Sequence, residues 1–206
     1  MSAPVGTVYL LDDDPGMLKA LERLLKTEGY EVRAYTSAQA FVGSHRQQAP
    51  ACLVLDVEMP ELSGLEVQQR LILGENPLPI IFLTGRGDIP MSVEAMRAGA
   101  SDFLVKPVKD VDLLRAVRAA LRRSAERLAD ESQRDALRQR YASLTPRERE
   151  VMALVVAGNL NKQIAGALGV VEGTVKVHRG RVMEKMGAET LSDLVRAAMR
   201  LGPMDR

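Results

Sequence analysis

Cysteine is nearly absent from this sequence of 206 residues. The one cysteine, Cys52, lies in an apolar run at residues 51–55, so no intrachain disulfide can form, and we expect a buried, inert thiol rather than a redox sensor. Long apolar runs are absent too, because none approaches the roughly 20 residues that cross a bilayer. Residues 1–4 supply no basic segment ahead of a signal-peptide core. We therefore predict a cytoplasmic protein with no membrane partner.

Two further absences narrow the chemistry. The sequence contains no Gly-rich P-loop and no Cys or His cluster of the kind that binds a transition metal. The net charge of +1 hides a gradient, because residues 1–122 carry 13 basic and 16 acidic side chains, whereas residues 143–206 carry 10 and 7. This positive excess near the C-terminus is a weak indication of nucleic-acid binding. The length fits one domain of about 120 residues and a smaller second one.

Short apolar runs alternate with segments of helical period in the first half, which predicts an α/β fold with a doubly wound, five-stranded parallel sheet. The expected strands are residues 7–11, 32–35, 52–55, 80–83 and 103–105. The first connection has an apolar helical stripe at residues 17, 18, 21, 24 and 25, and later helices are expected to open at Ser37, Ser63 and Ile89. We expect three of the helices to end at glycine caps, Gly29, Gly74 and Gly99.

From Val111 the pattern stays helical and charged until Pro146. We predict domains at residues 1–122 and 143–206, joined by a helical linker at 123–142. Leu114, Val117, Leu121 and Leu128 have roughly heptad spacing, but Ser124 and Glu131 interrupt the seam. A solvated linker is therefore favoured over a dimeric coiled coil. The sequence Thr145-Pro146-Arg147-Glu148 is typical of a capping box that opens a new helix.

Five polar residues stand where the predicted strands end: Asp12, Asp13, Asp56, Thr84 and Lys106. Ligand sites in open parallel sheets form outside these carboxyl ends. Converging carboxylates repel one another, so the set predicts a site for a hard divalent cation, with Mg²⁺ as the expected ion. An ammonium and a hydroxyl beside a metal-bound carboxylate can hold phosphoryl oxygens, which makes Asp56 the expected nucleophile. Asp14 and Asp88 are interpreted as helix caps or surface charges.

These residues resemble the motifs of response-regulator receiver domains: residues 10–14 (LLDDD), 53–60 (LVLDVEMP), 63–64 (SG), Thr84 and 106–107 (KP), over about residues 5–122. Residues 87–91 (GDIPM) and 95–100 (AMRAGA) are similar in particular to the FixJ-type branch. The resemblance implies a flavodoxin-like fold in which Asp56 accepts phosphate from a histidine of a sensor kinase. It also implies that Mg²⁺ is bound directly by Asp13, Asp56 and the Glu58 carbonyl, and through water by Asp12.

The same resemblance implies a switch that couples Thr84 to Phe103. Phe103 lacks the hydroxyl of the tyrosine found in many relatives, so the switch would operate without a hydroxyl hydrogen bond. Glu58 and Arg86 stand at positions that tune phosphate lifetime in relatives, or else form a solvent-exposed pair.

In FixJ-type relatives phosphorylated receivers pair through helix four and strand five, which here implies a homodimer through Val93 and Arg97. The alternative is that Val93 packs inward and Arg97 is solvated.

The C-terminal part is predicted to be a small all-α domain with helices at about 146–157, 162–168, 172–186 and 191–201. Gly158 and Gly169 are expected to close the first two helices, and Asn161 and Thr190 to open the second and fourth. Helices two and three would form a helix-turn-helix. Residues 144–150 (LTPRERE), 161–165 (NKQIA) and 174–179 (TVKVHR) resemble LuxR/NarL-type DNA-binding domains.

The helix expected at residues 172–186 is the predicted recognition helix, and we expect Val175, Val182 and Met186 to face the core. The resemblance implies base contacts by Lys176 and Val177 in the major groove. The predicted phosphate contacts are Asn161, Lys162, Thr174, His178 and Arg181. Arg179 and Lys185 are also expected to point away from the core.

Four residues qualify this assignment. His178 is equally compatible with a satisfied surface histidine, and His45 is interpreted as one. Val171 stands where relatives usually have a serine that caps the recognition helix, and the missing cap costs this helix about 1 kcal/mol of stability. Gly180 stands where some relatives have a lysine that contacts a base.

The expected function is that of a DNA-binding transcriptional response regulator. Its partners would be double-stranded DNA with two half-sites, a sensor histidine kinase and, for an activator, RNA polymerase. A phosphatase or phosphotransferase could use the same acidic crevice, but the absent P-loop and second-domain catalytic set disfavour a turnover enzyme. A ligand-sensing regulator would need an apolar pocket where this sequence places carboxylates and Lys106.

Overall fold

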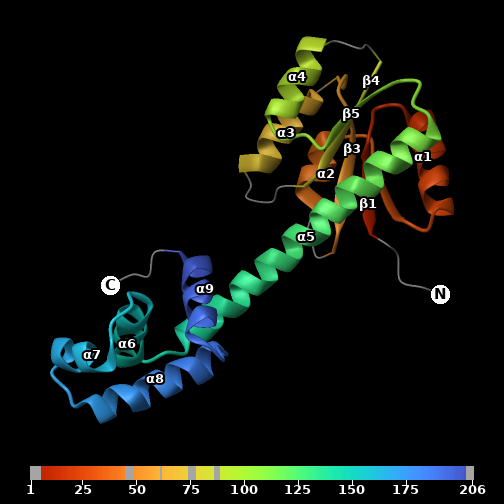
Figure 1. Cartoon of the computed structure of the whole chain (residues 1–206). Helices are drawn as coiled ribbons and strands as arrows, with labels where there is room; N and C mark the ends of the chain where they lie inside the picture. The colour runs from red at the N-terminus through yellow and green to blue at the C-terminus, as the bar shows by residue number, and fades with distance from the viewer. Residues whose placement is uncertain (1–5, 45–48, 61, 74–77, 86–88, 203–206) are drawn as a thin grey trace. The chain divides into compact units, whose positions relative to one another are not determined.

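The computed structural model describes residues 6–44, 49–60, 62–73, 78–85 and 89–202, and contacts divide the chain into two compact units, 1–128 and 129–206. The first unit (Figure 1) contains strands β1 (Thr7–Leu11), β2 (Glu31–Tyr35), β3 (Ala51–Asp56), β4 (Ile80–Thr84) and β5 (Asp102–Val105). Its helices are α1 (Pro15–Thr27), α2 (Ala38–Ser44), α3 (Gly64–Leu73), α4 (Ile89–Arg97) and the first part of α5 (Asp110–Ala142). The second unit contains the end of α5 and helices α6 (Pro146–Val156), α7 (Asn161–Leu168), α8 (Glu172–Met186) and α9 (Leu191–Leu201).

The five strands form one parallel sheet in the order β2-β1-β3-β4-β5. This confirms the predicted fold class, and each predicted strand is found within one residue at either end. In this order β1 and β3 are neighbours, and their connections leave toward opposite edges of the sheet. The crevice between their carboxyl ends is the topological switch point at which such folds bind ligands.

Alternation along the strands separates two hydrophobic cores, one on each face of the sheet. Val8 and Leu10 of β1 face a core shared with α1 and α5, whereas Tyr9 and Leu11 face a core shared with α2, α3 and α4. Because successive strand residues point to opposite faces, a strand buried on both sides reads as a continuous apolar run. Cys52 is fully buried, as predicted, and burial raises the pKa of its thiol, which disfavours the reactive thiolate.

Glycine and serine residues lie at the helix ends as predicted, wherever these positions fall within the described residues. Gly29 (φ 86°) and Gly99 (φ 91°) adopt the left-handed conformation directly after α1 and α4. Ser63 and Glu66 cap α3 reciprocally, because each side chain accepts a hydrogen bond from the other residue's N–H. Gly74, Asp88, Arg86 and His45 lie outside the described residues.

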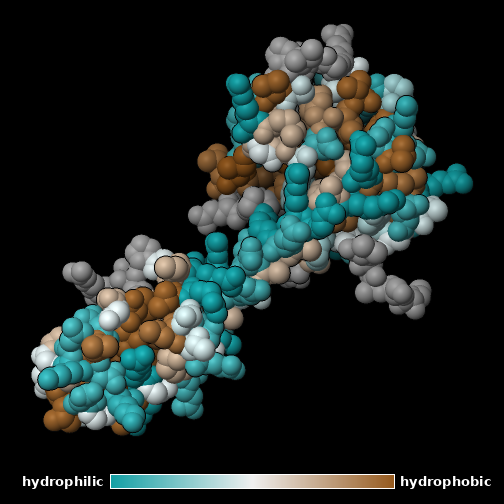
Figure 2. Space-filling view, in the orientation of Figure 1, coloured by the Kyte–Doolittle hydropathy of each residue, from teal (hydrophilic) through white to brown (hydrophobic). Residues whose placement is uncertain are grey.

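Helix α5 is one continuous helix of 33 residues that starts in the first unit and ends in the second. Leu114, Val117 and Leu121 are buried against the sheet of the first unit, so these heptad positions serve the core of that unit rather than a coiled coil. Ser124 interrupts the apolar seam for a structural reason: its Oγ accepts a hydrogen bond from the N–H of Ala51 at the start of β3. Residues 129–136 are exposed, and Figure 2 shows the middle of α5 as a hydrophilic stretch.

The second unit has its own core, in which Val175, Val182 and Met186 of α8 are buried as predicted. The predicted capping box is present at the start of α6, where Thr145 Oγ1 accepts from Glu148 N–H and Glu148 Oε2 accepts from Thr145 N–H. Leu137 and Tyr141 of α5 also pack against this core. The last turns of α5 therefore belong to the second unit, although the sequence prediction placed them in the linker.

The start of α7 differs from the prediction. Asn161 was expected to cap this helix, but it is the first helical residue and Leu160 occupies the N-cap position. Leu160 has no side-chain acceptor, and instead its N–H donates to Gln163 Oε1 at 2.8 Å. Half of a capping box is therefore enough to start the helix one residue early. Val171 opens α8 without a side-chain cap, as predicted, and Gly169 (φ 66°) closes α7.

Candidate functional site

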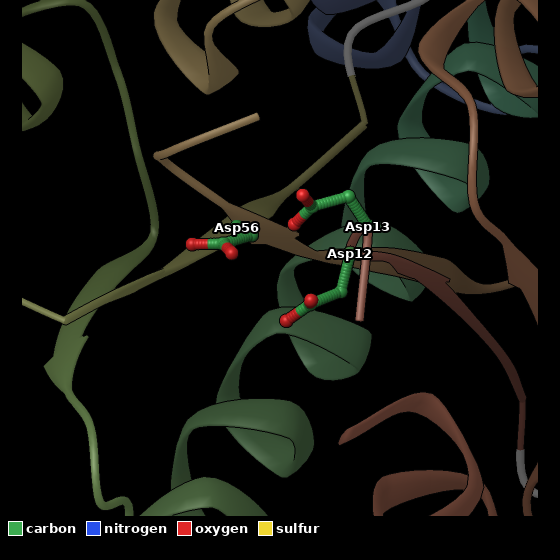
Figure 3. A group of neighbouring side chains, drawn as sticks. All are labelled: Asp12, Asp13 and Asp56. Atoms are coloured by element: carbon green, nitrogen blue, oxygen red, sulfur yellow. The ribbon is translucent and has the colours of Figure 1, made fainter. Parts of the chain in front are cut away.

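Three carboxylates meet at the carboxyl ends of β1 and β3 (Figure 3). Asp12 and Asp13 directly follow β1, and Asp56 is the last residue of β3. One oxygen from each lies within 4.8 Å of the others. Asp12 and Asp56 are buried, at 2% and 6% exposure, whereas Asp13 is exposed to solvent. The cluster therefore has two anchored carboxylates and one at the mouth of the site.

Lys106 closes this cluster from the loop after β5. Its Nζ lies 2.7 Å from Asp12 Oδ2 and 2.9 Å from Asp56 Oδ2. The second oxygen of each buried carboxylate accepts a backbone hydrogen bond, from Asp14 N–H to Asp12 Oδ1 and from Glu58 N–H to Asp56 Oδ1. Ion pairs and backbone bonds together fix the direction in which both carboxylates point.

The electrostatics of the site favour an additional cation. Burial raises the pKa of Asp56 above its ordinary value, and the hydrogen bond from Lys106 only partly opposes this shift. Burial lowers the pKa of Lys106, but its hydrogen bonds to Asp12 and Asp56 outweigh burial, so the net shift is upward and the ammonium is retained. One ammonium thus faces two buried carboxylates and the neighbouring Asp13, which leaves negative charge for a further cation to offset.

The donor set fits Mg²⁺, because it offers carboxylate oxygens at short mutual distances and no soft ligand. Asp12, Asp13 and Asp56 are the side chains that would hold the ion. Glu58 follows two residues after Asp56 with an exposed side chain, which leaves its predicted contribution to the main-chain carbonyl. Asp14 belongs to α1 instead, since its Oδ1 caps the helix by accepting from Gly16 N–H at 2.7 Å.

The predicted switch residues lie on the two neighbouring strands. Thr84 ends β4 and is buried, and its carbonyl accepts a hydrogen bond from Lys106 N–H at 2.7 Å. Phe103 on β5 is partly buried, with its ring 6.2 Å from that of Phe82. The structure therefore joins Thr84 and Lys106 through their main chains and places Phe103 on β5, three residues before the lysine that follows this strand.

Helix α4 and strand β5 expose apolar side chains near this end of the sheet. Val93 is 43% exposed and Arg97 is exposed, so Val93 does not pack inward. Met96 and Val105, which the sequence reasoning did not single out, are exposed on the same two elements at 47% and 49%. The signal that could have found Val105 is the position of β5 at the edge of the sheet.

The second candidate site lies on the exposed side of α7 and α8. Lys162, Lys176, Val177 and Arg181 are exposed, as a surface that reads DNA requires. Thr174 and His178 are partly buried. The Nδ1 atom of His178 is buried and has no hydrogen-bond partner within the described part of the chain. His178 thus presents at most one ring nitrogen to a ligand.

Two residues of the predicted DNA-binding set bind each other, the predicted phosphate contact Asn161 and Arg179. Arg179 Nη1 donates to Asn161 Oδ1 at 3.2 Å, which ties α8 to the first turn of α7. Gly180 has open space where a Cβ would stand, so packing does not require glycine at that position. The fold therefore gives no steric reason for the absence of the lysine that some relatives have at position 180.

Sequence reasoning missed the basic residues that hold the helix-turn-helix from outside. Arg147 of α6 donates to the carbonyl of Leu168, and Arg140 of α5 donates to the carbonyl of Met186. Lys185, expected to point away from the core, lies 2.6 Å from the buried Glu148. Sequence carries little signal for these contacts, because they join residues 21 to 46 positions apart.

A parallel sheet in the order 2-1-3-4-5, with an acidic trio and a lysine at its carboxyl ends, joined to a helix-turn-helix, defines a receiver coupled to a DNA-binding domain. The family profile described as response regulator receiver domain matches residues 8–118, and that described as bacterial regulatory proteins, luxR family, matches residues 142–198. The chain belongs to the response regulators with a LuxR-type DNA-binding domain.

Named relatives span nearly the whole chain. Response regulator protein TodT of Pseudomonas putida is 45% identical over 98% of this chain and 88% of its own length. Transcriptional regulatory protein FixJ of Bradyrhizobium diazoefficiens is 41% identical over 97% of this chain and 98% of its own length. The solved structure of response regulator StyR superposes with a TM-score of 0.85 at 43% identity, covering 93% of this chain and 97% of that one.

Membership establishes the general role. A receiver domain implies a histidine kinase as partner and a LuxR-type domain implies DNA, so the chain serves transcription regulation in a two-component system. Receivers generally bind Mg²⁺ at an acidic pocket, which corresponds to the aspartate cluster here. The domain composition is consistent with a transcription factor that is not an enzyme. Among the described residues, no helix is long and apolar enough to cross a membrane.

Proposed function

We propose that this chain is a DNA-binding response regulator that a sensor histidine kinase activates by phosphorylating Asp56. The observation that carries the proposal is the position of Lys106 Nζ, 2.9 Å from Asp56 Oδ2 and 2.7 Å from Asp12 Oδ2. A buried carboxylate beside an ammonium and two further carboxylates is arranged to accept a phosphoryl group when a divalent cation offsets the charge. The further partners are an operator with two half-sites and, if the chain activates transcription, RNA polymerase.

In the proposed reaction a carboxylate oxygen of Asp56 attacks phosphorus while the bond from phosphorus to the kinase histidine nitrogen breaks. Mg²⁺ would be held directly by Asp13, Asp56 and the Glu58 carbonyl and through water by Asp12, and would neutralise charge on the phosphoryl oxygens. Lys106 exchanges its ion pair with Asp56 for a phosphoryl oxygen. Thr84, one strand away from Asp56, moves toward the phosphate and donates its hydroxyl. The phosphate stays on the chain's own side chain, so no turnover is expected.

The proposed switch carries this change to α4 and β5. Thr84 ends β4, and Phe103 lies on the adjacent β5, so a movement of Thr84 alters the space available to the Phe103 ring. The exposed apolar side chains of the same two elements, Val93, Met96 and Val105, suit a pairing face that needs an apolar centre, and Arg97 supplies a charged rim. We propose that phosphorylation favours a homodimer through this face.

DNA recognition is assigned to α8. Lys176 and Val177 are exposed near its N-terminal end, where a lysine can donate to guanine and a valine can contact a thymine methyl. Lys162 and Arg181 are exposed and suit phosphates, together with Thr174, His178, Asn161 and Arg179. Asn161 and Arg179 hydrogen-bond each other, so they contribute to DNA binding only if contacts with DNA phosphates replace this bond. Two such domains on adjacent half-sites bind more tightly than one through effective concentration.

The proposal is tested by Asp56→Asn in the intact chain. We expect Mg²⁺-dependent incorporation of one label from acetyl phosphate into the unsubstituted chain, and none into Asp56→Asn, because the amide keeps the shape but does not attack phosphorus. Asp14→Asn is the matched control: it makes the same change near the site, and Asn also caps a helix, so labelling should persist.

Mass spectrometry of the intact chain and its peptides measures the result. Undiminished phosphorylation of Asp56→Asn would refute the assignment of the acceptor. Repeated turnover of acetyl phosphate would indicate a phosphatase instead, and an unlabelled wild-type chain would indicate a ligand-sensing regulator.

A further inference from the structure

The C-terminal end of the recognition helix α8 is held by a residue from outside the helix-turn-helix. Arg140, near the end of α5, donates from Nη1 to the carbonyl of Met186 at 3.1 Å. Met186 is the last residue of α8, and Gly187 follows it in the left-handed conformation with φ 64°. A carbonyl at a helix C-terminus lacks an intrahelical donor and carries partial negative charge, so a guanidinium there satisfies the carbonyl and complements the helix dipole.

The guanidinium of Arg140 also covers Gly187 closely. A Cβ at Gly187 would lie 2.8 Å from Nη1 and 3.3 Å from Cζ of Arg140, so a side chain at this position would displace the guanidinium. Glycine at this position therefore permits both the helix-ending conformation and the approach of the arginine.

Other contacts join the same region to the end of α8. Lys185 on the last turn of α8 reaches the carbonyl of Ser143, directly after α5, at 3.2 Å and Glu148 of α6 at 2.6 Å. Leu137 and Tyr141 pack against the core that contains Met186. Arg140 thus lies within a continuous contact between the last turns of α5 and the end of α8.

We propose that Arg140 is a positioning residue for DNA recognition, which docks the end of α5 onto the C-terminus of α8 and so fixes the axis and rotation of that helix. The proposed base-contacting Lys176 stands ten residues before Met186, about 15 Å away along the helix. Arg140 therefore acts on Lys176 only through α8. Bidentate base contacts demand placement within about 0.5 Å, so a small displacement of the helix affects base contacts before it affects phosphate contacts. The inference depends on the proposed DNA binding by α8.

The test compares Arg140→Gln with Arg138→Gln in the intact chain. Arg138 is exposed on the same helix and pairs only with Asp135 among the interactions described, so its substitution removes the same charge without touching α8. The probes are a duplex that the unsubstituted chain selects from a random-sequence library and a duplex of random sequence. Dissociation constants on both, their salt dependence and the melting temperature are measured.

We expect Arg140→Gln to weaken binding to the selected duplex by about threefold to tenfold, while random-duplex binding and the slope of log affinity against log salt match those of Arg138→Gln. Arg140→Lys should restore most of the selectivity, because an ammonium can also donate to the Met186 carbonyl. Gly187→Asn, which tolerates the left-handed conformation but displaces the arginine, should reproduce the loss. The double variant should lose no more than either single one.

Two results would overturn the proposal. One is that Arg140→Gln retains the selectivity of Arg138→Gln. The other is an equal loss on both duplexes with a lower melting temperature, which assigns Arg140 to stability alone. Failure of the unsubstituted chain to select any duplex would instead count against the proposed DNA binding, so the two failures are distinguishable.

Discussion

At the scale of single residues, both proposed sites depend on which groups bind a lysine side chain. Lys106 is held by two carboxylates, which raises its pKa and keeps it charged beside the proposed acceptor. Lys185 is likewise held by partners within the fold, because it donates to Glu148 and to the Ser143 carbonyl. Lys176 is exposed on α8. An exposed lysine on a recognition helix can donate to a base or to a phosphate, and these alternatives predict different selectivity.

Lys176→Ala is therefore expected to lower affinity for the selected duplex about tenfold more than for random duplex, because a base contact discriminates between sequences. The measurement is a pair of equilibrium titrations at matched salt. Lys162→Ala is the control: it should weaken both complexes about equally and reduce the salt slope by about one. Equal losses in Lys176→Ala would reassign this lysine to a phosphate.

At the scale of an element, helix α6 shows how a local cap becomes a tertiary contact. Glu148 closes the capping box with Thr145 and also binds Lys185 of α8, while its side chain remains 3% exposed. These hydrogen bonds lower the pKa of Glu148 to about 2, with the bond from Lys185 contributing most. A carboxyl group whose folded pKa is lowered stabilises the fold when ionised, so its contribution is complete above about pH 4.5 and is lost as pH falls toward 2.

Glu148→Gln should consequently destabilise the second unit by about 1–2 kcal/mol at pH 7, since the partly exposed Lys185 recovers some hydration. The difference from wild type should shrink as pH falls from about 4.5 toward 2. Calorimetry of the intact chain across this range measures both. Glu150→Gln, which removes an exposed carboxylate two positions along α6, should have little effect at any pH. A Glu148→Gln difference that does not change with pH would contradict this account.

At the scale of the whole molecule, the question is how a phosphate on one unit changes DNA binding by the other. A single small domain that makes few basic contacts with DNA should bind it weakly, whereas two domains on half-sites one helical turn apart gain through effective concentration. The exposed Val93, Met96 and Val105 supply the apolar surface for such pairing. Phosphate-dependent dimerisation would thus act through the number of domains presented to DNA.

Val93→Asp tests this step. We expect the variant to accept phosphate on Asp56, to remain monomeric in light scattering when phosphorylated, and to lose most of the phosphate-induced gain in operator binding. Val111→Asp is the matched control, because Val111 is 70% exposed in the first turn of α5, where an added carboxylate favours the helix dipole. A phosphorylated Val93→Asp chain that dimerises and binds normally would point instead to release of an inhibitory receiver contact through α5.

Much of this protein follows from local sequence pattern. Alternating apolar runs and helical stripes predicted all five strands and the sheet class, and the position of Asp12, Asp56 and Lys106 after their strands predicted one acidic crevice. These features are readable because strand and helix periods, caps and strand ends are properties of neighbouring residues. The capping boxes at Thr145 and Thr190 were predictable for the same reason.

Tertiary structure alone decided the contacts between distant residues. Ser124 looked like a break in a coiled-coil seam until its bond to Ala51, 73 positions away, showed why a polar residue is buried there. By helical period Lys185 and Arg179 point away from the core, but they bind Glu148 and Asn161. Arg140 carried no sequence signal at all. A long, flexible charged side chain can reach several partners, and only the packing of helices remote in sequence determines which acceptor lies within hydrogen-bond distance.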